Sequence, residues 1–534
     1  MHSDRSFDAI VIGAGISGLY AVYRLREMGL SVQAFDAADE VGGTWYWNCY
    51  PGARVDSESH VYQYWFSDEL LNEWDWSERF PAQPEAEHYL RFVADKFSLR
   101  KHYKFATRVA HADWDEASGC WTIETDAGER YTAPYFVSCA GMLSTPKVPP
   151  FAGHESYRGI IAHTARWPRE GIDLKGKRVG VVGTGATGIQ VIQTIAAEVA
   201  ELKVFQRTAQ YAVAMKNRRY TDGAFAQWRQ HYPQLKDKVQ HTFSGHAFEF
   251  LTTPWQSLTA EQRRAELERL WAEGSLAMWV GGFQESFVDA DINEQVSAFV
   301  REKIRARITD PEVAELLTPR AYGFGTYRVP LETTYYEAFN RDNVELTDVR
   351  RTPIERFTEK GLVVDGREFE LDVVILATGF DAGTGALTRM DIHGRDGISL
   401  TELWSRDIRS TLGLQVHGFP NLFTVAGPLA PSTAFCNMTT CLQQQVDWIA
   451  SCIAWLRSTG KHRIEPTAAK EDEWVRHHDE VANATLLVKT ESWYTGANIE
   501  GKPRRLLSYI GGVGNYRQIC DEVQASGYQG FAVA

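Results

Sequence analysis

Two short glycine-rich segments constrain the fold of this chain more than any other feature of its sequence. An apolar run that ends at Ile12 leads into GAGISG, in which Gly13, Gly15 and Gly18 form a GxGxxG pattern. A helical pattern follows, and then a second apolar run that is closed by Asp36. In such units the glycines allow a tight turn, close approach of the backbone to a pyrophosphate and close helix packing. The order predicts a dinucleotide-binding unit in which Asp36 accepts hydrogen bonds from a ribose.

The same order recurs in the region of residues 177–208, where an apolar run leads into GTGATG. Its glycines are Gly183, Gly185 and Gly188. At the position that corresponds to Asp36, this unit has Gln206, followed by Arg207 and Thr208. An acid favours a free ribose 2′-hydroxyl, whereas an arginine can bind a 2′-phosphate in bidentate fashion. The first unit is therefore predicted to bind FAD or NAD, and the second to bind NADP. The alternative for Arg207 is that it is an ordinary solvated arginine on the surface.

Two dinucleotide units in one chain imply two redox cofactors that must meet. The simplest pairing places FAD in the first unit and NADPH in the second, with a hydride passing to the flavin. Later apolar runs that end near Gly379 and Gly427 have the pattern of strands that pass close to a cofactor.

The overall composition excludes several classes of protein. The chain has 534 residues, of which 44% are hydrophobic and 23% charged, so it can bury several cores and does not have the composition of a disordered protein. The formal net charge of -13 argues against a nucleic-acid-binding protein, which would carry a basic surplus. We expect no secretory leader, because the first apolar run starts close to residue 7, and no membrane association, because no apolar stretch approaches ~18 residues.

The cysteines indicate a reducing compartment. Seven of them are scattered along the chain, an odd number that suits free, buried thiols and predicts a cytoplasmic protein. Cys436 and Cys441 form a C-x4-C pattern that allows a redox pair, although two packed thiols are the favoured interpretation. The sequence has no CxxC pattern and no metal-type spacing of His and Cys, so no metal site is predicted.

The linker between the two units contains a third motif, YRGIIAHTARWP at residues 157–168. On physical grounds alone His163 would be a structural histidine. The segment nevertheless resembles the fingerprint of the flavin-dependent Baeyer–Villiger monooxygenases, F-x-G-x3-H-x3-W-(P/D). Gly159, His163 and Trp167 match it, and Tyr157 replaces the usual phenylalanine. Related flavin monooxygenases that oxidise nitrogen or sulfur usually end the motif in Phe or Tyr, so Trp167 favours the Baeyer–Villiger branch.

A further motif of that family, (A/G)-G-x-W-x4-(F/Y)-P-G-x3-D, is similar to GGTWYWNCYPGARVD at residues 42–56. The resemblance extends over residues 7–515 and includes stretches that look like the phenylacetone and cyclic-ketone monooxygenase subgroup. It implies a type I (class B) enzyme that holds FAD non-covalently and uses NADPH. Such an enzyme converts ketones with O2 into esters or lactones through a flavin C4a-peroxide.

The resemblance also implies roles for individual residues. The active-site arginine of the family matches Arg328 in the turn GTYRVP, and its acidic partner matches Asp56. A helix cap is the alternative role of Asp56. The lysine that often helps to hold the 2′-phosphate in relatives is Tyr327 here, a departure that bears on the preference for NADPH. The residues that match positions next to the flavin are Gly43, Thr44, Trp45, Asp56 and Tyr62, and Trp493 matches a position next to NADP.

These observations predict an α/β fold with two Rossmann-like, glutathione-reductase-like domains. Residues 1–141 and 387–534 are expected to form a discontinuous FAD domain, and residues 142–386 an NADP domain. A helical insertion is expected at about 222–320, with a capping box that starts at Thr259 and a helix that starts at Asp310. The loop 428–438 is either a wall of the substrate pocket or an ordinary surface loop.

Three other functions compete with Baeyer–Villiger oxidation. A disulfide reductase would carry a cysteine pair just after the first GG motif, where this chain has only Cys49. An N- or S-oxygenating monooxygenase is the main alternative, since the same flavin peroxide attacks soft heteroatoms. A non-enzymatic flavin-binding protein is disfavoured by Arg207 and Arg328. The sequence is compatible with a monomer but does not determine the oligomeric state.

Overall fold

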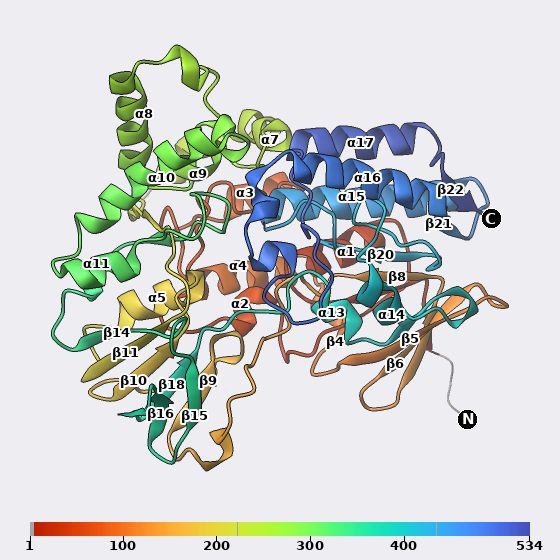
Figure 1. Cartoon of the computed structure of the whole chain (residues 1–534). Coiled ribbons are helices and arrows are strands. Elements are labelled where there is room, and N and C mark those ends of the chain that lie inside the picture. The colour runs from red at the N-terminus through yellow and green to blue at the C-terminus, as the bar shows by residue number, and fades with distance from the viewer. Residues whose placement is uncertain (1–4, 222, 434) are drawn as a thin grey trace.

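The computed structural model describes residues 5–221, 223–433 and 435–534. Two parallel five-stranded sheets organise the chain, and each of them contains one GxGxxG turn (Figure 1). Helices cover the sheets, and a second group of helices forms the upper left of the view in Figure 1. The arrangement is a mixed α/β fold.

The first parallel sheet has the strand order β20-β8-β2-β3-β4. Its strands are β2 (Ala9–Ile12), β3 (Val32–Phe35), β4 (Tyr103–Lys104), β8 (Tyr135–Ser138) and β20 (Leu422–Thr424). β2 is completely buried, as expected for a strand between two parallel neighbours. Helix α1 (Ile16–Glu27) follows β2 and packs against α15 (Met438–Ser458), which comes from the far end of the sequence. The chain therefore returns to this sheet after leaving it for some 280 residues.

The second parallel sheet has the order β14-β11-β10-β18-β9. Its strands are β9 (Ile160–His163), β10 (Arg178–Val182), β11 (Glu201–Gln206), β14 (Val344–Asp348) and β18 (Val373–Leu376). Helix α5 (Ala186–Ile195) connects β10 to β11, and α12 (Tyr335–Ala338) packs against α5. β10 and β11 pair in parallel from Arg178 opposite Glu201, which is the strand–helix–strand unit that the sequence predicted.

Smaller sheets flank these two. One sheet has the order β1-β7-β6-β5-β19 and contains β1 (Arg5–Ser6), β5 (Val109–Asp115), β6 (Cys120–Thr125), β7 (Arg130–Ala133) and β19 (Ile392–His393). An antiparallel sheet contains β15 (Ile354–Phe357), β16 (Gly361–Val364) and β17 (Arg367–Glu370). Two strand pairs are β12 (Val213–Ala214) with β13 (Leu331–Glu332), and β21 (Ile464–Pro466) with β22 (Phe531–Val533).

Helices dominate the region between β12 and β13. They are α6 (Ala224–Arg229), α7 (Tyr232–His241), α8 (Ala260–Glu273), α9 (Ala277–Val280), α10 (Ala290–Arg305) and α11 (Pro311–Leu317). The predicted capping box is confirmed, because Thr259 and Gln262 satisfy each other's backbone N–H groups at the start of α8. The predicted start at Asp310 is also confirmed, since its side chain accepts from Glu312 and Val313.

Further α-helices lie outside these regions of the chain. They are α2 (Thr44–Trp47), α3 (Asp68–Glu73), α4 (Gln83–Lys96), α13 (Gly385–Thr388), α14 (Leu400–Arg406), α16 (Ala468–Asn483) and α17 (Val513–Ala525). α15, α16 and α17 lie along the upper right of Figure 1. Among the described residues, we find no helix with the length and hydrophobicity that a membrane crossing requires.

One prediction about the cysteines is wrong. Cys436 and Cys441 are joined by a disulfide, so this pair is neither free nor merely packed. Cys441 lies in the first turn of α15, and Cys436 lies in the loop directly before that helix. The helical start turns the two side chains toward each other across the C-x4-C spacing. The other five cysteines are free, as predicted.

Candidate active site

A cavity of about 1930 Å³ reaches both glycine-rich turns. It is lined by Gly13 and Gly15 of the first turn, by Gly183 and Gly185 of the second, and by Arg328. Pockets for a single small molecule usually enclose ~300–1,000 Å³. The cavity can therefore hold two extended ligands that meet inside it.

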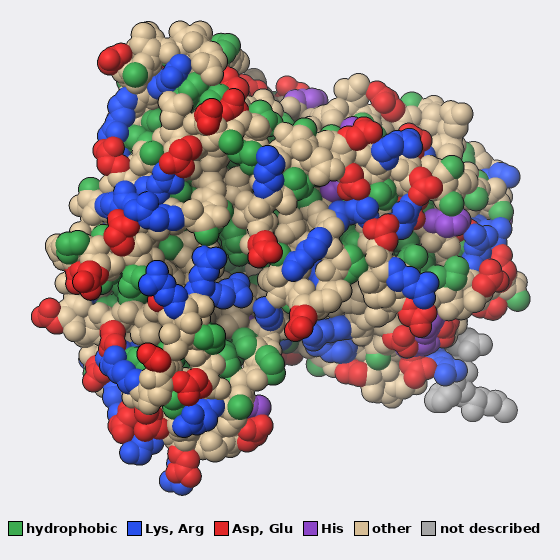
Figure 2. All heavy atoms as spheres, viewed as in Figure 1, with side chains coloured by type: hydrophobic (Ala, Val, Ile, Leu, Met, Phe, Trp, Pro, Cys, Tyr) green, Lys and Arg blue, Asp and Glu red, His purple; other side chains and the backbone are tan. Residues whose placement is uncertain are grey.

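The charge of this cavity is opposite to that of the whole chain. Eight Lys or Arg residues line it against three Asp or Glu, whereas the chain carries a net charge of -13. Figure 2 shows Lys and Arg side chains near the middle of this face, where the surface is hollowed. The lining cations are Arg54, Arg108, Lys147, Arg166, Arg207, Arg328, Arg389 and Arg504. Such a surplus of positive charge favours anionic ligands, and the phosphates of dinucleotides are anionic groups of this kind.

The first glycine-rich turn is fixed from both sides. Gly13 has a φ of 106°, and a Cβ there would lie 2.3 Å from the carbonyl oxygen of Cys139. Asp36 stabilises the neighbouring backbone, because its carboxylate accepts from Ala14 N at 2.6 Å and from Ala38 N at 2.7 Å. Desolvation by the surrounding protein raises the pKa of Asp36. Asp36 lines the cavity at the end of β3, where the sequence placed it.

The second turn repeats this geometry with different side chains at its rim. Gly183 has a φ of 107°, and a Cβ there would lie 2.5 Å from the carbonyl oxygen of Ala377. Gln206 faces away from the nucleotide position, since its side chain donates to the Leu316 carbonyl at 2.8 Å. Arg207 and Thr208 follow it and line the cavity. Arg207 is exposed to that space and not packed into the protein.

The predicted flavin-side residues gather next to the first turn. Gly43 lies so close to it that a Cβ on Gly43 would be 2.6 Å from the Cα of Gly15. Thr44 and Trp45 begin α2, and Trp45 Nε1 donates to the Tyr62 hydroxyl at 3.0 Å. All these residues line the cavity. Two segments that are well separated in sequence therefore form one rim.

Arg328 and Asp56 form an ion pair inside the cavity. The guanidinium also donates to the Thr433 carbonyl at 3.3 Å and lies over the ring of Trp279 at 5.4 Å. Burial opposes the charge of Arg328, but interactions with Asp56 and Tyr494 together hold the pKa of the arginine above its ordinary value. The pair brings together two residues that are 272 positions apart in the sequence.

Only part of the fingerprint segment lines the cavity, and Gly159, His163 and Trp167 are not among the lining residues. Trp167 is buried, and its carbonyl accepts from Cys49 Sγ at 3.6 Å. A Cβ on Gly159 would lie 2.3 Å from the hydroxyl oxygen of Tyr157, and that hydroxyl donates to Leu371 at 3.0 Å. The phenol that departs from the family pattern therefore has a hydrogen-bond partner. Gly159 and Trp167 have packing roles, as do Gly18 and Gly188 behind the two turns.

His163 of the fingerprint connects to a cavity residue that the sequence analysis missed. Its Nε2 lies 3.3 Å from the carbonyl oxygen of Lys147 and 3.2 Å from the hydroxyl of Thr378, which itself donates to the Lys147 carbonyl at 2.6 Å. Burial lowers the pKa of His163. The histidine thus helps to fix the backbone of Lys147, whose side chain lines the cavity near Arg207.

Comparisons with known proteins agree with this geometry. Residues 8–226 match the family model described as flavin-binding monooxygenase-like. The chain is 56% identical over 533 residues to an acetone monooxygenase (methyl acetate-forming) of Gordonia sp. (strain TY-5), with 100% of both chains covered. It is 42% identical to a Baeyer–Villiger monooxygenase of Pseudooceanicola batsensis, with 98% of this chain and 95% of the relative covered. The chain belongs to the flavin-dependent Baeyer–Villiger monooxygenases.

A solved structure supports the same assignment. The chain superimposes on a complex of OTEMO with FAD and NADP with a TM-score of 0.96 and 38% identity, and both chains are covered completely. The predicted fold class of two dinucleotide-binding units is confirmed. The predictions of a ketone-oxidising Baeyer–Villiger monooxygenase that uses FAD and NADPH are also confirmed by this family membership.

The C-terminal part of this Baeyer–Villiger monooxygenase completes the cavity wall. Trp493 lines it, as do Thr433, Cys436 and Met438 from the loop before α15 and its first residue. Residue 434 of the same loop lies outside the described residues. Because Thr433, Cys436 and Met438 line the cavity, the interpretation of this loop as a pocket wall is favoured over that of a surface loop.

Proposed function

We propose that this chain oxidises a small ketone to an ester, with FAD at the first glycine-rich turn, NADPH at the second, and Arg328 acting at the reacting oxygen. One observation supports this most strongly. The ion pair of Arg328 and Asp56 lies in a cavity that both glycine-rich turns also line. A fixed cation is thereby placed where the ends of two dinucleotides can meet.

The first turn suits the pyrophosphate of FAD. Only the Cα of Gly43 lies within 4 Å of a Cβ built on Gly15, and no side chain caps the N-terminus of α1. The free N–H groups of that helix end are donors for phosphate oxygens. Reduced flavin and O2 supply the oxidant when the cofactor is bound. Gly43, Thr44, Trp45 and Tyr62 would hold the flavin beside this turn, and Asp36 the ribose.

The second turn suits NADPH. A Cβ on Gly185 would have no neighbour within 4 Å, so the backbone there is open to a pyrophosphate. Arg207 is exposed to the cavity, and Lys147 lies near it. Burial is the main cause that lowers the pKa of Lys147, and the positive charge of Arg207 lowers it further. We propose that the two cations hold the 2′-phosphate together, so that Lys147 takes the place of the family lysine that is Tyr327 here. Thr208 and Trp493 would complete the site.

Arg328 provides charge without proton transfer. A guanidinium stays protonated at any physiological pH and can form two parallel hydrogen bonds. Negative charge develops on oxygen during the reaction, and a donor that is already oriented stabilises it without reorganisation. Asp56 would keep Arg328 in place and balance its charge while the substrate is absent.

Aromatic side chains would keep water away from this position. The Phe435 ring lies 5.1 Å from that of Trp279 and 4.8 Å from that of Phe287, measured between centroids. Such packing leaves an apolar environment in which electrostatic interactions with Arg328 are stronger than in water. The 56% identity to an acetone monooxygenase supports a small ketone as the substrate.

The decisive experiment combines a ketone series with variants of Arg328. NADPH oxidation would be measured with acetone, 2-butanone, cyclohexanone and acetophenone, and the products identified by gas chromatography. We expect ester formation to be fastest with the small ketones. Arg328→Ala should leave anaerobic flavin reduction by NADPH nearly unchanged but lower ester formation by ~10²–10³-fold. Arg328→Lys, which keeps the charge but loses the planar fork, should be intermediate.

Two outcomes would contradict this proposal. Normal ester yield in the Arg328→Ala enzyme would remove the assigned role of the arginine. Oxidation of amines or sulfides in the absence of any ester product would favour the N- or S-oxygenating alternative instead.

We also propose the predicted division of the chain, with residues 1–141 and 387–534 as the FAD domain and 142–386 as the NADP domain. The sheet membership of β20 supports the discontinuity of the former. The strands β9, β10, β11, β14 and β18 all lie within the latter range. The cytoplasmic location stays a prediction, and the oligomeric state, for which the sequence is compatible with a monomer, is tested by size-exclusion chromatography.

A further inference from the structure

A compact cluster of two histidines and two aspartates lies apart from the cavity. His111 and Asp113 belong to β5, and His393 ends the neighbouring edge strand β19, which begins directly after Asp391. β5 and β19 pair in parallel with His393 opposite Asp113. Residues two positions apart on a strand point to the same face, so His111 and Asp113 share a face of the sheet. None of the four residues lines the cavity.

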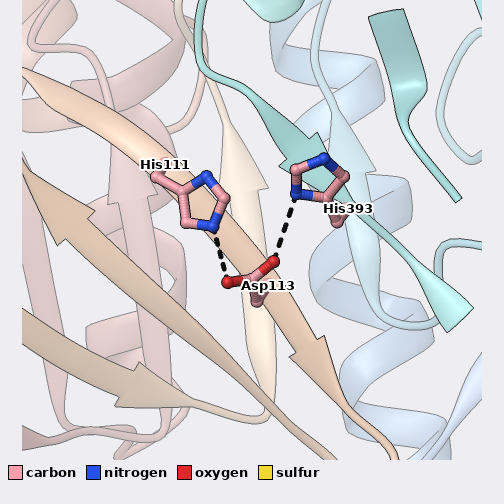
Figure 3. Close-up of side chains that lie close together, drawn as sticks. All are labelled: His111, Asp113 and His393. Atoms are coloured by element: carbon pink, nitrogen blue, oxygen red, sulfur yellow. Dashed lines mark hydrogen bonds and ion pairs between the residues drawn. The ribbon is translucent and has the colours of Figure 1, made fainter. Parts of the chain in front are cut away.

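The two imidazoles flank one carboxylate (Figure 3). His111 Nε2 lies 2.5 Å from Asp113 Oδ2, and His393 Nδ1 lies 3.2 Å from the other oxygen, Asp113 Oδ1. The potential donor atoms of His111, Asp113 and His393 all lie within 4.8 Å of one another. Three ligands from two adjacent strands thus converge on one point.

We propose that this cluster is a zinc site, in which His111 Nε2, His393 Nδ1 and the Asp113 carboxylate bind the ion. Imidazole nitrogen and carboxylate oxygen are ordinary zinc ligands, at about 2.0–2.2 Å from the ion. Ligands at that distance from one ion in tetrahedral geometry are roughly 3.3–3.5 Å apart. The present separations therefore need only small side-chain movements.

The fourth residue strengthens this assignment. Asp391 Oδ2 lies 2.9 Å from His111 Nδ1, on the opposite side of the ring from Asp113. Ligating histidines usually donate their second ring N–H to a carboxylate, which fixes the tautomer and orients the ring. With Nδ1–H donated to Asp391, the lone pair of His111 Nε2 points at the shared centre. Asp391 is therefore a positioning residue and not a ligand.

The site is accessible to solvent ions. The side chains of His111 and His393 are 31% and 27% exposed, and that of Asp113 is 52% exposed. Water can complete the coordination, because two histidines and one carboxylate leave an open position. A bound ion would tie the two-residue strand β19 to β5 and so hold the edge of this sheet.

The competing interpretation is a metal-free ion-pair network. Although burial opposes its charge, hydrogen bonds to Asp113 and Asp391 raise the pKa of His111 above its ordinary value. A protonated His111 between two carboxylates would hold the strands together by itself. A proton and a zinc ion compete for the same nitrogen, so the two interpretations make opposite predictions about metal binding.

The test is a zinc titration of the purified flavin-containing enzyme at pH 7.5 in competition with a chromogenic chelator. We expect one equivalent to bind. His393→Asn and Asp113→Asn should each abolish this binding, and Asp391→Asn should weaken it by about 10–100-fold. His241→Asn serves as the matched control, because His241 is an exposed histidine 3.5 Å from the Asp237 carboxylate on α7. This control should bind zinc like the unmodified chain.

Flavin absorbance of each variant shows that it is folded, and zinc should raise the melting temperature of the unmodified enzyme but not that of His393→Asn. Equal zinc binding by the unmodified chain and by both ligand variants would overturn the proposal. Absence of tight binding in the unmodified chain would overturn it as well and would leave the ion-pair network as the account of the cluster.

Discussion

The two nucleotide-binding units of this enzyme have nearly the same backbone and differ at the end of their second strand. Gly13 and Gly183 have φ values of 106° and 107°, and each lies against a carbonyl oxygen of a neighbouring strand end. In the first unit the strand ends at Asp36, which accepts from two backbone N–H groups. In the second, Arg207 follows the strand and faces the cavity.

This difference separates what binds a dinucleotide from what selects it. The turn and the helix N-terminus recognise a pyrophosphate, which FAD and NADPH share. The residue at the strand end meets the ribose, where the two ligands differ by a phosphate. On the proposed assignment, the residues just after the strand, Asp36 in one unit and Arg207 in the other, direct two similar frameworks to two different cofactors.

The largest effect is expected when the first turn is closed with a methyl group. Gly15 has a φ of -85°, which alanine adopts readily, and its Cβ would lie 3.4 Å from the Cα of Gly43. Gly15→Ala should therefore fold but fill the space of the pyrophosphate, so that FAD and all activity are lost. The ratio of flavin to protein absorbance after purification measures this. A fully yellow Gly15→Ala protein would separate the first turn from flavin binding.

The next largest effect concerns the phosphate that distinguishes the second unit. Hydrogen bonds to charged groups contribute about 1.5–3 kcal/mol. Arg207→Ala and Lys147→Ala should each raise the KM for NADPH by roughly 10- to 100-fold. The KM for NADH should change little, because NADH lacks the 2′-phosphate. An equal rise for both coenzymes in the Lys147→Ala enzyme would show that Lys147 does not contact this phosphate.

Closing the second turn should have a smaller effect than closing the first. Gly185 has a φ of -73°, and a Cβ there has no neighbour within 4 Å. Gly185→Ala should keep its flavin and raise the KM for NADPH by about tenfold, or ~1.4 kcal/mol. Steady-state kinetics with NADPH and the flavin spectrum test both parts. Loss of flavin in Gly185→Ala would reverse the assignment of the two units.

The smallest effect is a pH dependence at the junction of the units. Burial lowers the pKa of His246, which lies beside Asp56 and Arg328, to about 4. Between pH 6.5 and 4 this histidine is protonated in the unfolded chain but neutral in the folded chain. The free energy of unfolding therefore falls as the pH decreases through this range. At pH 5.5 this costs about 1 kcal/mol relative to pH 7.5.

His246→Asn should flatten this dependence, whatever its effect on stability at neutral pH. Urea unfolding at pH 7.5 and pH 5.5 gives the two free energies for each protein. An unchanged difference in His246→Asn would place the acid sensitivity elsewhere, for example at His60, whose pKa burial lowers to about 3.

Much of the fold could be predicted because its signals are local. Both strand–turn–helix units appear where the glycine pattern placed them, with a positive φ at Gly13 and at Gly183. The caps at Thr259 and Asp310 were predicted for the same reason. The disulfide was allowed by the C-x4-C spacing but not favoured, although its cysteines are only five positions apart. Whether two such sulfurs meet depends on how the chain enters α15, which the spacing does not determine.

Long-range contacts in the candidate site were harder to predict from the sequence. The pairing of Arg328 with Asp56 was expected only through the family resemblance, because nothing in the local sequence of either residue identifies the other. Lys147 lies in a proline-rich segment without any motif, and only the structure shows that it lines the cavity near Arg207. The His–Asp cluster on β5 and β19 was invisible to a search for metal-ligand spacing, since its partners are 280 positions apart.

The sequence by itself determined the two dinucleotide units, the family, and the difference between the two units, which is an acid at Asp36 in the first and an arginine at Arg207 in the second. These depend on backbone angles, helix ends and short motifs, all of which act over a few residues. The tertiary structure decided which distant side chains share a space: Arg328 with Asp56, Lys147 with Arg207, and His111 with His393. Such meetings depend on the packing of whole sheets and helices, in which every element along the chain takes part.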